Sequence, residues 1–513
     1  MDHSSSATTK SCHGANMTRY YLSALPLALV LSGCADSVDV ASSVAASGLC
    51  ETPDVVLDTD FPSGNIASCK SVNQTGLAIK IEPEDEPPIN CSAWYAFRLT
   101  PRKSGTVQVN LSYEHCGHRY WPKTSTDGLN WTRLSPDSIT VEDIDGVAQA
   151  RMTITLGDKP MFVAGQEIIS SSDYAAWVEQ ASQSPLVEQF LLGKSAEGKD
   201  IPAMSITATG SKPREQIVLI GRQHPPEITS ALVMMPFVET LLSDDPLARR
   251  FRARFETIVV PVLNPDGVDH GYWRHNTGGT DLNRDWGPFA QPETRLMDKL
   301  LGDIETAPDK QLRLFVDFHS TQNDVFYTIP DDYPTNPPLF LKKWLDLLQA
   351  KMPDYTVNRD ANHNLGQANS KNYVHKKYGV PTLTFEIGDE TNRILIAKLG
   401  TEAARAMMET LLADNSDGLA SEANHISERH YGSLKNQCPL CEADGQKTTQ
   451  SRPSHKPMTA VRFPDIAESG LNRRSNPGVA HAAPDLQGLN RFRHIMHPDD
   501  LRTLLYRVVG ESD

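Results

Sequence analysis

The sequence has no excess of positive charge. Its 64 acidic residues outnumber its 49 Lys and Arg residues, so the formal net charge is −15. This balance argues against a general affinity for nucleic acid or anionic lipid headgroups, although it does not exclude a small basic pocket. The sequence also lacks internal repeats. Its 513 residues leave room for two or three domains, and a hydrophobic content of 39% is typical of a globular protein.

Long hydrophobic runs are also scarce. The apolar run after Arg19 is too short to span a bilayer and is typical of the hydrophobic part of a secretory signal, although a buried helix is an alternative. It ends in Leu-Ser-Gly-Cys, which resembles the lipobox of bacterial lipoproteins, and an ordinary signal peptide is the alternative. We therefore expect a leader and lipoprotein signal peptide over residues 1–34, lipidation at Cys34, and a protein anchored by lipid in the periplasm of the bacterial cell envelope. By resemblance to known sorting, Ala35 in place of Asp favours the outer membrane.

Cysteine is infrequent, with eight residues in the chain. Cys50, Cys69, Cys91 and Cys116 fall within one stretch and could form two disulfide bonds in an oxidising periplasm. The sequence leaves all three pairings open. The pair at 438 and 441 has no second Cys pair nearby, so it indicates a loop disulfide or free thiols rather than a structural metal site.

The pattern of the chain changes several times after the leader. Residues 35–50 are rich in Ala, Ser and Val and suit a tether. Residues 51–165 show short alternating runs between turn clusters, which predicts an all-β sandwich domain. Residues 170–415 alternate helices with continuous apolar strands at 217–220, 258–263, 312–318 and 382–387, which predicts an α/β sheet covered by helices on both faces. Residues 416–513 give few such signals, and we expect a largely irregular tail.

One candidate metal site stands out in the α/β part. His224 and Glu227 are three residues apart and open a helix directly after the predicted strand 217–220, so both side chains could reach one ion. His319 follows the predicted strand 312–318. Two imidazoles and one carboxylate suit zinc and leave a position open for water, as a catalytic site needs. A chance His-x-x-Glu pair is the alternative for this motif alone.

Further motifs extend the pattern. Asn-Pro-Asp-Gly at 264–267, Trp-Arg at 273–274, Asp-Leu-Asn-Arg at 281–284 and Thr-Phe-Glu at 384–386 complete a series that resembles the zinc carboxypeptidase, or funnelin, family. Together with Phe-Pro-Ser-Gly-Asn at 61–65, it resembles the branch of cytosolic carboxypeptidases and their bacterial relatives. The resemblance implies a mixed, mostly parallel eight-stranded sheet flanked by helices, preceded by the β-sandwich domain, and one Zn²⁺ per chain.

The resemblance also implies a role for each matching residue. His224, Glu227 and His319 would be the zinc ligands. Glu386 would be the general base that takes a proton from the zinc-bound water. Arg274 would stabilise the oxyanion. The substrate's terminal carboxylate would be bound by Asn283 and Arg284. Ordinary alternatives are a strand-end charge for Glu386 and surface salt bridges for the arginines.

One position departs from the family pattern. Members usually carry a Tyr about 22 residues before the catalytic Glu, where this chain has Asn364. Tyr327 and Tyr373 are candidates for a displaced role, although neither aligns with that position. The same count places Lys371 at the position that reads the substrate's last side chain. A Lys there favours an acidic side chain, whereas the alternative is a solvated surface Lys.

These residues predict a zinc metallocarboxypeptidase, a hydrolase that removes C-terminal residues from peptides, with a preference for acidic residues if Lys371 lines the pocket. The alternative is a cell-wall amidase that splits a γ-glutamyl–diaminopimelate bond in peptidoglycan peptides. A non-catalytic binding protein is a third option, and the intact Glu386 and ligand set argue against it. The expected partners are a peptide or peptidoglycan-peptide substrate and a membrane through the lipid anchor only, and no nucleic acid.

Overall fold

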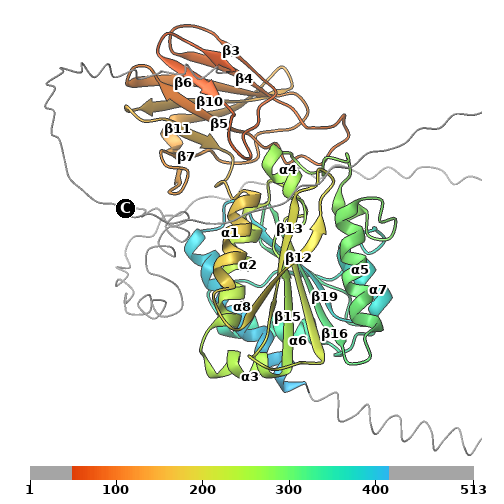
Figure 1. Cartoon of the computed structure of the whole chain (residues 1–513). Helices are drawn as coiled ribbons and strands as arrows, with labels where there is room; N and C mark the ends of the chain where they lie inside the picture. The colour runs from red at the N-terminus through yellow and green to blue at the C-terminus, as the bar shows by residue number, and fades with distance from the viewer. Residues whose placement is uncertain (1–48, 415–513) are drawn as a thin grey trace, which may run out of the picture. The chain divides into compact units, whose positions relative to one another are not determined.

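The computed structural model describes residues 49–414 of the chain (Figure 1). The predicted signal peptide, Cys34, the tail from residue 416 and the Cys pair at 438 and 441 lie outside these residues. Within residues 49–414, no helix combines the length and the apolar character needed to cross a bilayer.

The first part of the described chain forms two β-sheets around one core. The six-stranded sheet has the order β1 (Cys50–Glu51), β2 (Val55–Asp58), β5 (Ala96–Pro101), β11 (Met161–Ala164), β7 (Lys123–Ser125) and β8 (Thr132–Arg133). The five-stranded sheet has the order β3 (Ser68–Ser71), β4 (Gly76–Ile81), β6 (Gly105–Tyr113), β10 (Val147–Leu156) and β9 (Ile139–Ile144), which the short helix η1 (Pro136–Ser138) precedes. Alternate residues of β6 and β10 are buried, because each of these strands turns one face to the core. The expected β-rich domain ahead of the α/β domain is confirmed.

Two disulfide bonds brace this β domain. Cys50 is bonded to Cys69, which joins β1 of one sheet to β3 of the other. Cys91 is bonded to Cys116, which joins the loop after β4 to the loop after β6. The structure thus selects one of the three pairings that the sequence left open.

The second part contains an eight-stranded mixed sheet. Its order is β12 (Val187–Lys194), β13 (Asp200–Ile206), β15 (Phe255–Val260), β14 (Glu215–Gly221), β16 (Gln311–Thr321), β19 (Thr382–Gly388), β17 (Val325–Tyr327) and β18 (Arg359–Asp360). The four central strands β15, β14, β16 and β19 are parallel to one another, whereas β13 and β17 run antiparallel to their central neighbours. This arrangement confirms the predicted fold class.

Helices cover both faces of the sheet, as Figure 1 shows. One core contains residues of α1 (Ser171–Ala181), α2 (Ile228–Leu242), α3 (Pro246–Arg254), α4 (Pro265–His270), α6 (Phe340–Lys351) and α8 (Arg393–Ala413). The other core contains residues of α5 (Pro292–Thr306), α7 (Ser370–Tyr378) and the short helix η2 (Leu282–Arg284). Ile217 and Leu219 of β14 belong to the first core, and Val218 and Ile220 to the second. Both faces of β14 are therefore buried, which explains its uninterrupted apolar sequence.

The order of the parallel strands creates a switch point between β14 and β16. The chain leaves β14, passes through α2 and α3, and returns to β15 on one side, whereas β16 lies on the other side. Ligands in open α/β sheets bind beyond the carboxyl ends of the strands at such a point. The segments that follow β14, and the last residues of β16 and β19, meet there.

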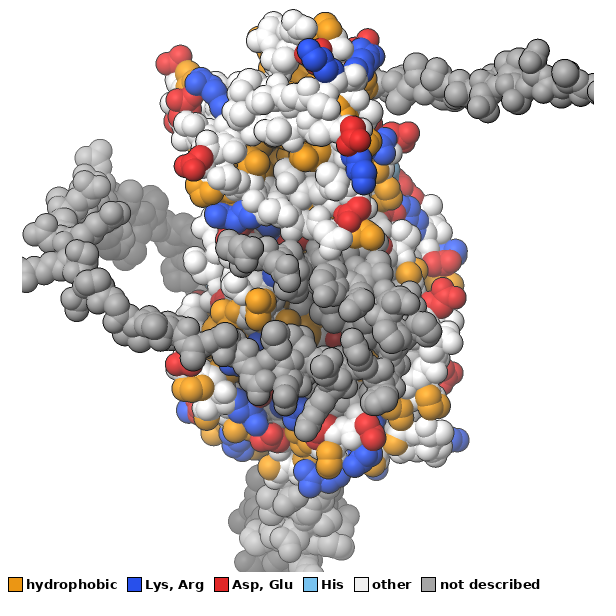
Figure 2. Space-filling view, turned by 90° about the vertical axis from the view of Figure 1, so that its left-hand side faces the viewer, with side chains coloured by type: hydrophobic (Ala, Val, Ile, Leu, Met, Phe, Trp, Pro, Cys, Tyr) orange, Lys and Arg blue, Asp and Glu red, His pale blue; other side chains and the backbone are white. Residues whose placement is uncertain are grey.

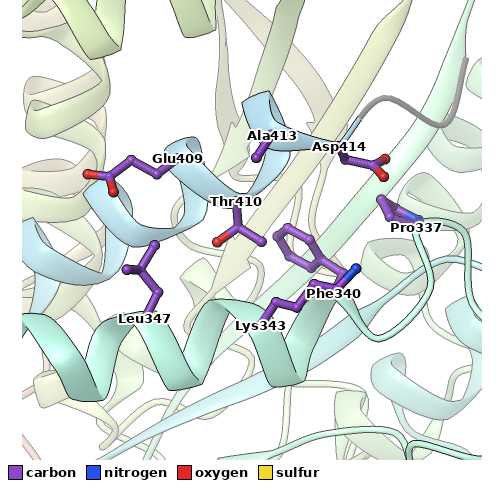
Figure 3. A pocket seen from close by; sticks show the side chains of 8 residues that line it. All are labelled: Pro337, Phe340, Lys343, Leu347, Glu409, Thr410, Ala413 and Asp414. Carbon is purple, nitrogen blue, oxygen red and sulfur yellow. The ribbon is translucent and has the colours of Figure 1, made fainter. Parts of the chain in front are cut away.

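A surface pocket of about 480 Å³ lies between α6 and α8, away from the switch point (Figure 3). Phe340, Leu347, Thr410 and Asp414 are among its lining residues. The carboxylate of Asp414 bonds Arg313 near the start of β16, so this pocket lies at the opposite end of the sheet from the carboxyl ends of the strands. On the face that Figure 2 shows, charged side chains of both signs are interspersed.

Candidate active site

The three predicted metal ligands converge at the switch point. His224 lies in the loop after β14, Glu227 is the residue directly before α2, and His319 lies near the end of β16. Nδ1 of His224 is 2.8 Å from Oε1 of Glu227, and Nδ1 of His319 is 2.7 Å from Oε2 of the same carboxylate. All three side chains are buried. Their ligand atoms lie close enough together to hold one metal ion.

The outer nitrogen of each imidazole faces another carboxylate. Nε2 of His224 lies 3.0 Å from Asp281, and Nε2 of His319 lies 2.9 Å from Asp317. Such partners fix the tautomer of a metal-binding histidine, so that the inner nitrogen keeps its lone pair for the ion. Asp317 had not been predicted from the sequence as a residue of this site. Its spacing of two from His319 on a strand, which places both side chains on one face, was the available signal.

The electrostatics match a site for a cation. Burial opposes the ionisation of Glu227, yet the positive charges of His224 and His319 hold its pKa well below its usual range. Burial likewise opposes the charging of His319, but Asp317 and Glu227 raise its pKa well above its usual value. The site thus combines buried carboxylates with imidazoles whose inner nitrogens face one point. Two imidazoles and a carboxylate form a donor set that zinc prefers, so the residues present fit this ion.

Glu386 lies beside His319 on the sheet. The two residues are paired in register on the parallel strands β16 and β19, so their side chains point to the same face. Oε2 of Glu386 is buried and has no hydrogen-bond partner among the described residues. Burial raises the pKa of this carboxyl to about 8. A nearby cation would favour its ionised form, which is the form a general base needs.

Arg274 joins this group from the loop after α4. Its Nε donates to Oδ2 of Asp281 at 2.7 Å, while the other oxygen of that carboxylate faces His224. Burial opposes the ionisation of Asp281, but the charges of His224 and Arg274 hold its pKa well below its usual range. Asp281 thus links the predicted oxyanion donor to a predicted metal ligand.

Asn283 and Arg284, in η2, differ in how free their side chains are. Oδ1 of Asn283 accepts a hydrogen bond from the backbone N–H of Ser370 at 3.0 Å, and the residue is buried. Arg284 is half-buried and donates to the backbone oxygen of Asn283 at 2.8 Å, with no carboxylate of residues 49–414 within ion-pair distance. Arg284 therefore offers more free donors than Asn283 for a substrate carboxylate.

Lys371 is buried rather than solvated, so the alternative of a surface lysine is wrong. Its Nζ donates to the backbone oxygens of Thr328 and His363 at 3.2 and 3.3 Å. Among the described residues, no carboxylate lies within ion-pair distance of this ammonium, and burial lowers its pKa to about 8. Burial also lowers the pKa of His363, and the charges of Lys371 and Arg284 lower it further, which places both cations near this ring.

The two candidate tyrosines lie in different places. The hydroxyl of Tyr373 donates to Asp298 of α5 at 2.5 Å, and its ring packs against Trp286 and Phe289. Tyr327 lies on β17 next to β19, and its ring stacks on His363 with 3.9 Å between centroids. Burial raises the pKa of Tyr327, and the charge of Glu386 contributes. Of the two tyrosines, Tyr327 is the one whose strand is paired with the strand of Glu386.

A cluster that could hold a metal ion lies at the switch point of an α/β sheet, flanked by a carboxylate and by guanidinium groups, and this is the arrangement expected of a metal-dependent hydrolase site. A family model described as zinc carboxypeptidase matches residues 174–398. A model described as the N-terminal domain of cytosolic carboxypeptidases matches residues 57–157. Both matches agree with the zinc carboxypeptidase family that the motifs resemble, and the second agrees with its cytosolic carboxypeptidase branch.

Similar proteins agree with this assignment. Cytosolic carboxypeptidase 2 of Danio rerio is 26% identical over 326 residues, which cover 56% of this chain and 44% of the relative. Cytosolic carboxypeptidase 6 of Mus musculus is 32% identical over 137 residues, which cover 25% of each chain. The chain thus spans less than half the length of these relatives. An uncharacterised protein of Zymomonas mobilis is 26% identical over 349 residues, which cover 64% of this chain and 87% of that protein.

Solved structures share the fold. A metallo-carboxypeptidase from Burkholderia cenocepacia has a TM-score of 0.58 at 20% identity and covers 70% of this chain and 99% of its own. A metallo-carboxypeptidase from Pseudomonas aeruginosa has a TM-score of 0.56 at 20% identity, with 69% of this chain and 98% of its own covered.

Proposed function

We propose that the protein is a zinc-dependent metallocarboxypeptidase that hydrolyses the last peptide bond of its substrates. The observation that carries this proposal is the convergence of two imidazole Nδ1 atoms on the two oxygens of Glu227, with Glu386 in register beside His319. His224, Glu227 and His319 would hold the ion. When bound, zinc supplies a positive charge that lowers the pKa of a water molecule and polarises a carbonyl group.

The protein's own groups would carry the other parts of the reaction. Glu386 accepts a proton from the attacking water and returns it to the leaving amine. Arg274, held by Asp281, donates to the oxygen that becomes negative in the transition state. Arg284 binds the terminal carboxylate of the substrate, because a guanidinium presents two parallel donors to a carboxylate. That contact explains why only the last bond would be cut.

The test compares peptides that differ only at the C-terminus. Purified protein should release the last residue from a peptide with a free carboxylate, and should leave the corresponding C-terminal amide intact. Removal of metal with a chelator should abolish release, and added zinc should restore it. Equal cleavage of the acid and the amide, or full activity without metal, would contradict the proposal.

The substrate preference belongs to the same proposal at a finer level. The buried ammonium of Lys371, which has no carboxylate of residues 49–414 within ion-pair distance, supports a preference for acidic C-terminal residues. The alternative substrate is a peptidoglycan peptide with a γ-glutamyl–diaminopimelate bond, which the lipobox sequence at 31–34 favours. Incubation with Glu-ended peptides and purified muropeptides side by side would separate these substrates, because mass spectrometry shows which bond is cut.

We further propose an outer-membrane lipoprotein exposed to the periplasm. The support is the lipobox sequence and Ala35 after the Cys. Cell fractionation combined with labelling by a clickable fatty acid tests this location.

A further inference from the structure

We propose that Glu84, a residue of the β domain, positions Arg274 for catalysis by binding the backbone of the loop that carries it. This inference rests on the proposed function, in which Arg274 stabilises the transition state. It assigns the β domain a part in the active site, although none of the residues predicted from the catalytic motifs belongs to that domain.

The carboxylate of Glu84 accepts hydrogen bonds from three consecutive backbone amides. Oε2 accepts from Trp273 at 2.7 Å, and Oε1 accepts from Arg274 at 2.9 Å and from His275 at 2.7 Å. Successive N–H groups that converge in this way form an anion-binding concavity. Hydrogen bonds to an ionised acceptor are roughly twice as strong as neutral ones. Glu84 therefore fixes the backbone on both sides of Arg274.

The loop that carries Glu84 is itself held in place. It joins β4 to β5, and its neighbour Asp85 bonds Nδ1 of His275, which adds a side-chain contact to the backbone contacts. The disulfide between Cys91 and Cys116 anchors the same loop further along. A carboxylate on a braced loop can define the position of its partners, since little of its own freedom remains.

The β domain also holds the segment just before Arg274. In the Phe-Pro-Ser-Gly-Asn sequence at 61–65, Ser63 Oγ donates to Val268 O at 2.7 Å and Asn65 Nδ2 donates to Gly271 O at 2.8 Å. Gly271 has a positive φ of 66°, and a Cβ there would lie 2.6 Å from the backbone oxygen of Ser63. The β domain thus contacts the α/β domain both at the end of α4 and at Arg274 itself.

The same side chains could instead be a second cation site, because Glu84, Asp85 and His275 offer ligand atoms close together. The contacts argue against that reading. Both oxygens of Glu84 face N–H donors, whose positive ends would repel a cation. The arrangement is that of a carboxylate used as an anchor for backbone amides.

Loss of the Glu84 contact should displace Arg274, because two contacts of this residue are its main restraints. Its side chain is tied by Nε to Asp281, and its backbone is tied by Glu84. A misplacement of about 1 Å can cost on the order of 100-fold in rate. Glu84→Gln keeps the shape but turns an amide N–H₂ toward the backbone donors. We expect this variant to lose about 10- to 100-fold in kcat, with KM changed much less and zinc content unchanged.

A matched control and a double variant distinguish positioning from simple destabilisation. Glu86→Gln removes the same charge from an exposed side chain of the same loop and should keep wild-type kcat. In an Arg274→Ala background, Glu84→Gln should cost little more, because the group that it positions is already absent. A full additional loss in that background would overturn the proposal.

Amide hydrogen exchange provides a readout that does not depend on activity. In the zinc-loaded full chain, a peptide that covers residues 273–275 should exchange about tenfold faster in Glu84→Gln than in wild type or Glu86→Gln. Glu84→Asp, which keeps the charge on a shorter side chain, serves as a second variant with a smaller increase if the first fails to fold. Unchanged exchange in both Glu84 variants would refute the proposal that Glu84 holds the backbone of residues 273–275. If wild type cleaves no peptide, the proposed function fails, and exchange still decides whether Glu84 holds this loop.

Discussion

The sharpest test of substrate preference is the replacement of Lys371 by Met, which keeps an unbranched side chain of similar length and removes its charge. In the structure this ammonium is buried, and its pKa is lowered from 10.5 to about 8. A shift of this size corresponds to an order-of-magnitude cost of about 3 kcal/mol for holding the charge in place. A substrate carboxylate that compensates the charge could recover up to this amount.

The recovered free energy sets the size of the expected effect. Because about 1.4 kcal/mol corresponds to a factor of ten, Lys371→Met should lower kcat/KM for Glu-ended peptides by roughly 10- to 100-fold. Peptides that end in Leu should change by less than about threefold, since they make no ion pair with the ammonium. Lys376→Met, on the exposed side of the same helix, is the matched control and should change neither substrate.

The pH dependence follows from the same lowered pKa. Below about pH 8 the free protein carries a charged Lys371, and the charge is lost as pH rises through about 8. The ratio of kcat/KM for Glu-ended over Leu-ended peptides should therefore fall about tenfold between about pH 7 and about pH 9. Taking this ratio cancels titrations that both substrates share. A ratio that is constant with pH, or that is unchanged in Lys371→Met, would show that Lys371 does not bind the last side chain of the substrate.

Other predictions concern the metal, the base and the anchor. His319→Ala should abolish stoichiometric zinc binding, and full zinc occupancy by metal analysis would contradict the ligand assignment. Glu386→Gln should keep zinc and fold but lose nearly all turnover, so activity within about tenfold of wild type would point to another base. Asp281→Asn should weaken zinc binding about 10- to 100-fold in a chelator competition, because the amide cannot orient His224 as the carboxylate does; unchanged affinity would contradict this. Cys34→Ala should leave the protein without lipid and outside the membrane fraction, and equal fatty-acid labelling would refute the lipobox interpretation.

The central strands could be predicted because burial on both faces leaves a continuous apolar signal. The predicted strands at 217–220, 258–263, 312–318 and 382–387 correspond to β14, β15, β16 and β19. The hairpin of β12 and β13 was not predicted, since β12 lies at the edge of the sheet and several of its residues are polar and exposed. The short strands β17 and β18 form through pairing with strands that are distant in sequence, so their own residues do not predict them.

The ligand set could be predicted because a metal needs particular atoms, and those atoms follow strand ends. The surroundings of the site could not be predicted from the sequence. The surface and the buried interpretation of Lys371 were equally consistent with the polar sequence of α7, and only the fold places its ammonium against Thr328 and His363. Glu84 and Arg274 are 190 positions apart in the sequence, and no local sequence pattern predicts their contact.

In the proposed function, the charges of the site residues allow a protein with a net charge of −15 to bind the terminal carboxylate of a peptide. Four buried or half-buried carboxylates belong to the site: Glu227, Asp281, Asp317 and Glu386. Three cations belong to the same set of proposed site residues: Arg274, Arg284 and Lys371. Without a metal the carboxylates outnumber the cations, which is consistent with the pKa of His319 being raised by Asp317 and Glu227. A divalent ion reverses this balance to a net positive charge, and the terminal carboxylate of a peptide then neutralises it. Metal binding and substrate binding should therefore be coupled, with a C-terminal product binding the zinc-loaded protein more tightly than the metal-free protein.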